Sequence, residues 1–414
     1  MCKYNDIMPN PGKRLTMLQA DGERASFQVA IKELYPGNID DYPPEATTLA
    51  KLSRLHHPHL IRCIATYRQG GMYCSLFPWA DGGNLRQFWA LEDAVPRNAD
   101  LITWAVKQMN GIASGIVALH NFSLQENCRH GDLKPQNILR FPGAGQDDFG
   151  TLVVSDLGSA TFHSEATGTR ARTGTAEGGY GTLRYEPPEA HLMKDLPRSR
   201  RYDVWSVGCI FLEFLIWLLY RWRGLKLFYE GIDRYWLETS SNHRRGSDGL
   251  PVLAKVHPKV QDYMRRMRND PRCSEGGAIG DLLKVIEHRL LVSRHTEVDP
   301  KVKADDADSS TAEQSDSETS SSQSSKPCIP KVMIKPPSFL QRGTDDIDGN
   351  IRADSVELGR LLGEIFEKVV ELPHYAFQSP EWEEVEFTGL PPPLHDGDDL
   401  EALFFRLTNR TLVD

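Results

Sequence analysis

The chain has 414 residues and a net charge of −9, from 48 Lys and Arg against 57 Asp and Glu. Forty per cent of the residues are hydrophobic and 25% are charged, which excludes a wholly disordered or fibrous protein. At roughly 150 residues per domain, this length allows about two or three folding units. The negative balance gives no reason to expect a nucleic acid as partner.

Cysteine usage and the apolar stretches predict a soluble protein of the cytoplasm or nucleus. The 7 cysteines are scattered, with no C-x-x-C pair, which argues against a disulfide framework or a zinc knuckle. The first residues lack the apolar core of a signal peptide. The most apolar stretch, 207–220, contains Glu213 and is too short to span a bilayer, so it predicts a buried core helix and no membrane partner. The oligomeric state stays open.

The first 80 residues predict short strands around one helix. Two apolar runs are separated by a turn at Asp21-Gly22, which favours an antiparallel pair. From Pro44 onward, apolar residues recur at three-residue spacing and predict a helix. The predicted strands span residues 14–19, 26–34, 60–67 and 72–79.

Helical patterns dominate after Gly82-Gly83. Residues 101–120 carry an apolar face with a period near 3.6, which predicts a long amphipathic helix. Short strands are expected at 138–140 and 151–155, on either side of a loop, and the chain is mostly helical from Arg201 onward. A strand-rich part followed by a helix-rich part is typical of a two-lobed α+β protein.

Residues 304–325 differ in composition from the rest of the chain. They hold six acidic residues and nine serines and no Lys, Arg, aromatic or large aliphatic residue, which predicts disorder. Helical periodicity returns at Asp354. We therefore expect a disordered acidic, Ser-rich insertion at about 293–351 within a single domain over 1–372, followed by an acidic C-terminal tail over 373–414.

The strongest chemical signal is the run His130-Gly-Asp-Leu-Lys-Pro-Gln-Asn137, followed 19 residues later by Asp156-Leu-Gly158. Phosphoryl transfer from ATP needs a carboxylate that orients the attacking hydroxyl, a metal-binding amide oxygen and a second carboxylate that reaches the phosphates through Mg²⁺. Asp132, Asn137 and Asp156 supply this set. Lys134 can neutralise charge on the transferred group.

These motifs resemble the eukaryotic protein kinase family. The resemblance implies an α+β, protein-kinase-like bilobal fold, with a small antiparallel β N-lobe over about 1–80 and a mostly helical C-lobe over about 81–372. Val29-Ala-Ile-Lys32 is similar to the strand whose lysine holds the ATP phosphates, and Glu45 to its ion-pair partner. Mg²⁺ would bind to Asn137 and Asp156. The remaining residues implied at the nucleotide are Ala30, Phe77 (at the back of the adenine pocket), Trp79, Ala80 and Leu139.

The resemblance continues into the second half of the chain. Gly181-Thr-Leu-Arg-Tyr-Glu-Pro-Pro-Glu189 is similar to the segment that ends in Ala-Pro-Glu, and Asp203-Val-Trp-Ser-Val-Gly to the start of the family's central helix. The resemblance implies that Asp203 holds the catalytic loop by its backbone, and that Arg352 forms a buried ion pair with Glu189. Thr182 and the Lys134-containing loop resemble those of serine/threonine kinases, so protein Ser/Thr is the expected substrate.

Two departures from the pattern leave alternatives open. No G-x-G-x-x-G precedes Lys32, so the chain is either truncated at its start or degenerate there, and a non-catalytic scaffold is the alternative function. Gly131 replaces the arginine that pairs with a phosphorylated activation loop, so little activation by phosphorylation at Thr169, Thr173 or Thr175 is expected.

A third reading is a small-molecule kinase. His-Gly-Asp-Leu also occurs in aminoglycoside and choline kinases. Those enzymes generally lack the Thr182–Glu189 segment and the helix that begins near Asp203, so this reading is disfavoured.

Overall fold

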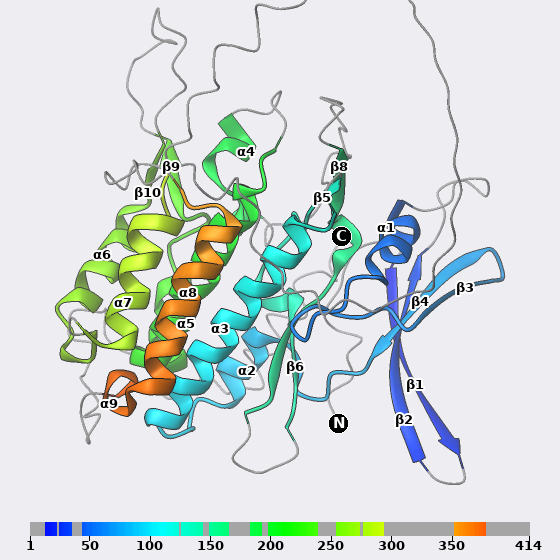
Figure 1. Ribbon diagram of the computed structural model, residues 1–414, viewed down its shortest axis with the longest axis horizontal. Coiled ribbons are helices and arrows are strands. Elements are labelled where there is room, and N and C mark those ends of the chain that lie inside the picture. The colour runs from blue at the N-terminus through cyan, green and yellow to red at the C-terminus, as the bar shows by residue number, and fades with distance from the viewer. Residues whose placement is uncertain are drawn as a thin grey trace, which may run out of the picture.

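The computed structural model describes residues 13–22, 25–34, 44–123, 126–143, 149–164, 183–192, 198–238, 254–273, 276–293 and 352–377. A small sheet with one helix lies on one side of the molecule, and a larger helical body lies on the other (Figure 1). This arrangement confirms the predicted bilobal α+β fold. The predicted insertion, apart from its first residue, and most of the tail lie outside the described residues.

The small sheet has four antiparallel strands in the order β1-β2-β4-β3. The predicted hairpin around Asp21-Gly22 is confirmed, and β2 then pairs with β4, which sets Ala30 opposite Phe77. The strands span Lys13–Gly22 (β1), Ala25–Leu34 (β2), Ala65–Gln69 (β3) and Met72–Pro78 (β4).

One predicted strand is wrong in its first half. The apolar run 60–67 was expected to lie in the small sheet, but β3 begins only at Ala65. The preceding residues pair instead with β7 of the helical body: Ile61 N donates to Val154 O at 2.8 Å, and Val154 N donates to His59 O at 2.9 Å. Tertiary pairing has therefore overridden local strand propensity and ties the two lobes together.

Helix α1 (Pro44–Leu52) forms where the three-residue apolar spacing predicted it. Its buried face includes Leu49 and Leu52, and the helix packs against the turn at Leu157–Ser159. Leu49 and Leu157 belong to one hydrophobic core. The turn that carries Asp156 is thus supported from the N-lobe side.

The helical body is built around two long helices, α3 (Ala99–His120) and α5 (Arg201–Tyr229). α3 packs against α8 (Ser355–Glu371), which brings the chain beyond residue 351 back onto the same body (Figure 1). The other helices are α2 (Leu85–Leu91), α4 (Pro188–Leu192), α6 (Pro258–Arg268), α7 (Ala278–Val285) and α9 (Pro373–Ala376).

Short two-stranded sheets complete the helical body. β6 and β7 form the predicted hairpin, and β5 pairs with β8 beside it. These strands span Glu126–Arg129 (β5), Ile138–Phe141 (β6), Thr151–Val154 (β7), Thr161–Ser164 (β8), Trp236–Glu238 (β9) and Ala254–Val256 (β10).

Helix α5 is the core helix that the apolar stretch predicted. It is long and apolar enough to cross a membrane, but its most apolar 18-residue window is wholly buried inside the protein. Its helical backbone breaks at Arg221, where φ is 59° and ψ is −174°. A break orphans the carbonyls of the preceding turn. Two arginine side chains meet this need: Arg97 donates to the Trp217 and Leu218 carbonyls, and Arg272 donates to Leu219 O.

Candidate active site

The loop between β5 and β6 brings three of the predicted catalytic residues together. Lys134 Nζ donates to Asp132 Oδ2 at 2.8 Å, and Asn137 Nδ2 donates to both Asp132 O at 2.8 Å and Asp132 Oδ2 at 3.1 Å. Asn137 is buried, whereas Asp132 and Lys134 keep side-chain exposures of 15% and 17%. The Asp132 carboxylate is therefore fixed in position and still accessible to a substrate.

His130 connects this loop to the strand that carries Asp156. Its Nδ1 accepts from Asp132 N at 3.2 Å, so its Nε2 must donate to Ser155 O, 2.9 Å away. Ser155 also donates from its backbone N–H, at 2.7 Å, and from its hydroxyl, at 2.9 Å, to Asn137 O. His130 thus connects the catalytic loop to the strand before Asp156 by hydrogen bonds.

The carboxylate of Asp203 fixes the catalytic loop by accepting hydrogen bonds from its backbone. Its oxygens accept from His130 N at 2.8 Å, Gly131 N at 2.9 Å and His120 Nε2 at 2.8 Å, and the side chain is completely buried. Burial by itself would raise the pKa of Asp203. The hydrogen bond and charge of His120, with the Gly131 N–H, outweigh it and keep the pKa below its usual value. A buried anion therefore fixes the backbone beside Asp132.

Asp156 faces Lys32 across the junction of the two lobes. Lys32 Nζ donates to Asp156 Oδ1 at 2.5 Å, and their side chains are only 8% and 14% exposed. Asp156 also has a left-handed backbone, with φ 57° and ψ 54°. Such a conformation costs a non-glycine residue on the order of 1–3 kcal/mol and is most often found at functional sites. This backbone directs the carboxylate back to the β2 lysine.

Two predicted site residues cannot be placed by their side chains. Glu45 lies in the first turn of α1, but its side chain falls outside the described residues, so its pairing with Lys32 stays a prediction. Thr182 lies just before the described stretch that resumes at Leu183. Its hydrogen bond to the catalytic residues likewise stays a prediction.

The residues implied at the nucleotide lie on both sides of the lobe junction. Ala30 and Phe77 face each other across β2 and β4, and Trp79 continues this pairing, since its N–H donates to Gln28 O at 3.4 Å. Ala80 and Leu139 belong to the hydrophobic core, against which Phe77 packs. Leu139 also forms an isolated β-bridge with Asn84, at the start of α2. Their contact with an adenine ring stays a prediction.

The donor set suits Mg²⁺. Magnesium in nucleotide sites usually takes one or two carboxylate or amide oxygens, and phosphate oxygens and waters complete its shell. Asp156 offers a carboxylate, and Asn137, whose amide nitrogen is used in hydrogen bonds to Asp132, offers its amide oxygen. With Mg²⁺-ATP bound, the metal would neutralise phosphate charge between these two residues.

The predicted ion pair between Arg352 and Glu189 is confirmed. Arg352 Nη1 lies 2.6 Å from Glu189 Oε1, and Arg352 also donates to Val292 O. The guanidinium lies 4.8 Å from the centre of the Trp205 ring and is nearly fully buried. The pair joins the start of α4 to the chain segment that leads into α8.

Sequence reasoning missed His120 and Glu213. His120 ends α3 and reaches Asp203, and Glu213 accepts from three tyrosine hydroxyls in the middle of α5. The one available signal was a polar residue on an otherwise apolar helix face. Such a signal does not reveal which distant side chain is the partner.

Comparisons with known proteins agree with this geometry. The family description "Protein kinase domain" matches residues 14–269. The chain is 29% identical over 171 residues to the serine/threonine/tyrosine-protein kinase HT1 of Arabidopsis thaliana, covering 41% of this chain and 38% of the relative. It is 28% identical over 200 residues to the serine/threonine-protein kinase RAD53 of Saccharomyces cerevisiae (46% and 22%). The matched region thus covers well under half of either relative.

A Lys, two Asp and an Asn that converge between a small sheet and a helical body define a phosphoryl-transfer domain. The family match covers more than half of the chain. The chain belongs to the protein kinase family, whose substrate is ATP.

Proposed function

We propose that this protein is an active serine/threonine kinase that transfers the ATP γ-phosphate to Ser or Thr of protein substrates, with Mg²⁺ as cofactor. The observation that carries the proposal is the hydrogen-bonded set Asp132–Lys134–Asn137, linked through His130 and Ser155 to Asp156 and Lys32. These groups supply the charges and hydrogen bonds that phosphoryl transfer requires, which supports the proposal. The name of the relative RAD53, a serine/threonine-protein kinase, favours Ser/Thr as acceptor.

In this mechanism Asp132 accepts a hydrogen bond from the substrate hydroxyl and takes its proton as the oxygen attacks phosphorus. Lys134, already 2.8 Å from that carboxylate, offsets the charge on the transferred group. Lys32 would contact the nucleotide phosphates directly, and Asp156 in the other lobe would reach them through Mg²⁺. The attacking and leaving oxygens then lie in line, which is the main contribution a protein makes to this reaction.

The second candidate function is a non-catalytic scaffold of kinase fold. The missing G-x-G-x-x-G before Lys32 favours it, because the backbone amides of that loop normally cover the phosphates. The complete set of polar residues described above favours the enzyme.

The decisive test is transfer of radiolabelled phosphate from Mg²⁺-ATP to a generic protein substrate. We compare the wild type with Asp132→Asn and with Asp233→Asn, a control at an exposed aspartate outside the site. The enzyme predicts incorporation into Ser and Thr by the wild type and the control, and a loss of about 100-fold or more in Asp132→Asn. Equal background in all three proteins would mean that the scaffold is the correct reading.

A further inference from the structure

Two arginine side chains stack on the same tyrosine ring next to the catalytic loop. The guanidinium carbons of Arg86 and Arg184 lie 4.3 Å and 4.8 Å from the centre of the Tyr229 ring. Arg86 also lies 5.9 Å from the centre of the Trp222 ring. Each contact is a cation–π interaction, which holds the positive charge in place without neutralising it.

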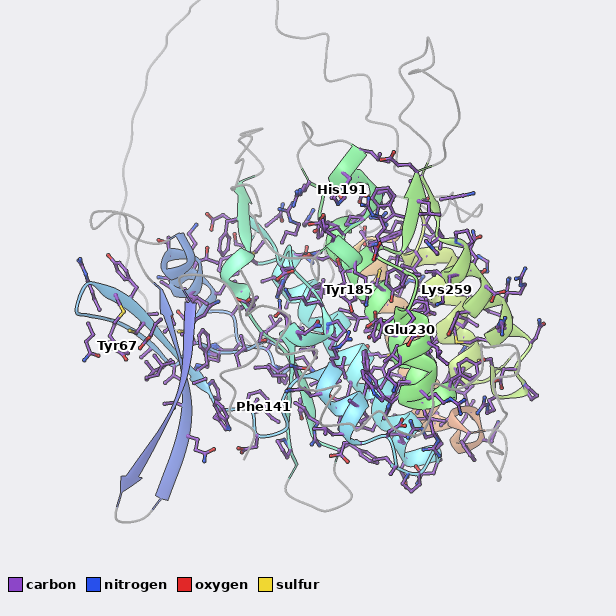
Figure 2. All side chains as sticks on the ribbon, turned by 180° about the vertical axis from the view of Figure 1, so that it is seen from behind. Tyr67, Phe141, Tyr185, His191, Glu230 and Lys259 are labelled. Carbon is purple, nitrogen blue, oxygen red and sulfur yellow. The ribbon has the colours of Figure 1, made fainter. Side chains whose placement is uncertain are left out.

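This pair lies close to the site of phosphoryl transfer. Arg86 belongs to α2, and α2 packs against the turn Pro135–Asn137 that directly follows Lys134. Arg184 belongs to the turn Leu183–Tyr185, whose last residue accepts a hydrogen bond from Ser206 of α5 at 2.8 Å. Figure 2 shows Tyr185 against α5 in the interior of the helical body. Arg86 thus lies on a helix that contacts the catalytic loop, and Arg184 lies beside it on the same tyrosine ring.

The buried carboxylate of Glu213 does not neutralise this charge at the surface. It is completely buried, and its two oxygens accept from the hydroxyls of Tyr185 at 3.0 and 3.1 Å, Tyr229 at 2.9 Å and Tyr235 at 2.8 Å. Its acceptor capacity is thus occupied by phenol groups. Glu213 therefore offers no open carboxylate to a basic substrate side chain.

Arg86 itself is half-buried and makes no hydrogen bond or ion pair with any residue that the structure describes. Arg184 donates from Nη2 to Ile232 O at 3.0 Å, a neutral acceptor. Two partly desolvated cations therefore face one buried anion. Because one anion offsets only one of the two positive charges, the pair gains from an anionic ligand that binds both groups.

We propose that Arg86 and Arg184 form a subsite that binds a carboxylate or phosphate group on the polypeptide substrate. The proposal rests on the protein kinase activity proposed above and narrows its substrate class. Substrates with an acidic or already phosphorylated residue near the acceptor are preferred, and substrates with Lys or Arg at that position are rejected by charge repulsion.

The direct test is peptide binding, which needs no catalysis. Each fluorescein-labelled peptide carries Ala in place of the acceptor residue. One flanking position at a time is varied to Asp, phosphoserine, Ala or Lys, and fluorescence anisotropy gives the Kd of each peptide. At one or more positions, we expect the wild type to bind the Asp or phosphoserine peptide at least tenfold more tightly than the Lys peptide. The phosphoserine-to-Asp ratio then tells which anion the subsite takes.

Variants of the two arginines show whether they cause the preference. Arg86→Gln with Arg184→Gln should remove the tenfold difference, whereas Arg86→Lys should keep most of it. Arg68→Gln is the matched control, because Arg68 also stacks on a tyrosine, 5.4 Å from the Tyr73 ring centre. In Figure 2 its neighbour Tyr67 lies in the small sheet, whereas Tyr185 lies in the helical body. Equal Kd values for the acidic and lysine peptides at every position would overturn the proposal. It would also be overturned if the double variant Arg86→Gln with Arg184→Gln kept the wild-type Tm and still preferred the acidic peptides.

The same peptides with Ser at the acceptor position separate this proposal from the proposed function. Selective binding without phosphate transfer would refute the kinase activity and leave the anion subsite standing. Transfer at equal kcat/KM to the acidic and lysine peptides would refute the subsite and leave the kinase activity standing.

Discussion

Lys32 and Asp156 form an ion pair of 2.5 Å although 124 residues separate them in the sequence. Lys32 lies near the C-terminal end of the β2 strand, and Asp156 follows β7 in the helical body. The pair therefore closes the junction between the two lobes at the place where the nucleotide phosphates would bind. The two side chains are too buried for solvent to screen their attraction strongly.

Replacing Lys32 with Met should abolish nucleotide binding and destabilise the protein. The variant leaves the Asp156 carboxylate largely buried without its cation, which costs about 3 kcal/mol or more. We expect no rise in Tm on addition of Mg²⁺-ATP and a lower free energy of unfolding in urea. The control is Lys51→Met, which removes an exposed ion pair with Glu126 and should cost less than about 1 kcal/mol. An unchanged response of Lys32→Met to Mg²⁺-ATP would contradict the assigned role.

Asp203→Asn should lower both stability and phosphoryl transfer. An amide can serve only part of the three N–H donors around the carboxylate, so about 3–5 kcal/mol of stability is lost. Since two of these donors fix the backbone before Asp132, kcat should fall about 100-fold while the KM for ATP changes little. Asp100→Asn, at an exposed position of α3, serves as the control for urea unfolding and kinetics. A normal kcat in Asp203→Asn would show that the loop needs no such support.

Arg97→Met should destabilise the protein through the break in α5. Arg97 donates to the carbonyls of Trp217 and Leu218 and also to the Asp93 and Val95 carbonyls. Unpaired buried carbonyls cost about 1–3 kcal/mol each, so a loss of about 2–4 kcal/mol is expected after partial relaxation.

Urea unfolding measures this loss against Arg360→Met, which removes an exposed pair with Glu364 and should cost about 0.5 kcal/mol or less. If the two variants unfold at the same urea concentration, the Arg97 contacts do not stabilise the break.

The contribution of Glu213 to the free energy of unfolding should depend on pH, and the direction follows from its raised pKa. Burial raises the pKa of Glu213, although the hydroxyl of Tyr235 and the charges of Arg184 and Arg86 oppose the shift. Because the folded state holds this proton more tightly than the unfolded state does, its contribution is fully present below about pH 4.5 and declines as the pH rises toward the raised pKa. The free energy of unfolding of the wild type, measured relative to that of Glu213→Gln, should therefore decrease as the pH rises above 4.5. Urea titrations of both proteins at several pH values measure this difference. If the relative stability of the wild type instead increased with pH, the pKa of Glu213 would be lowered in the folded state.

The replacement of arginine by glycine at position 131 predicts weak activation by phosphorylation. Gly131 has φ 82°, a backbone conformation that disfavours any side chain with a Cβ, and its N–H donates to Asp203. The triple variant with Ala at Thr169, Thr173 and Thr175, all outside the described residues, should keep at least about half of the wild-type rate. A large drop in that rate would reveal another cationic partner.

The sequence alone determined the fold class and most helices and strands, and it proposed a candidate catalytic set. These features were readable because each depends on local signals: an Asp-Gly turn, a 3.6-residue period, or polar residues at fixed spacing around Asp132 and Asp156. The ion pair between Glu189 and Arg352 was also readable, through a resemblance that extends across both lobes.

Only the tertiary structure decided which side chains meet. His120 and Glu213 lie in helices whose apolar period predicted burial and said nothing about partners. The run at 60–67 has strand propensity, yet its first residues pair with Val154 because the helical body offers a free strand edge there. The stacking of Arg86 and Arg184 on Tyr229 joins residues far apart in the chain. Such contacts follow from how the elements pack, which local propensity does not encode.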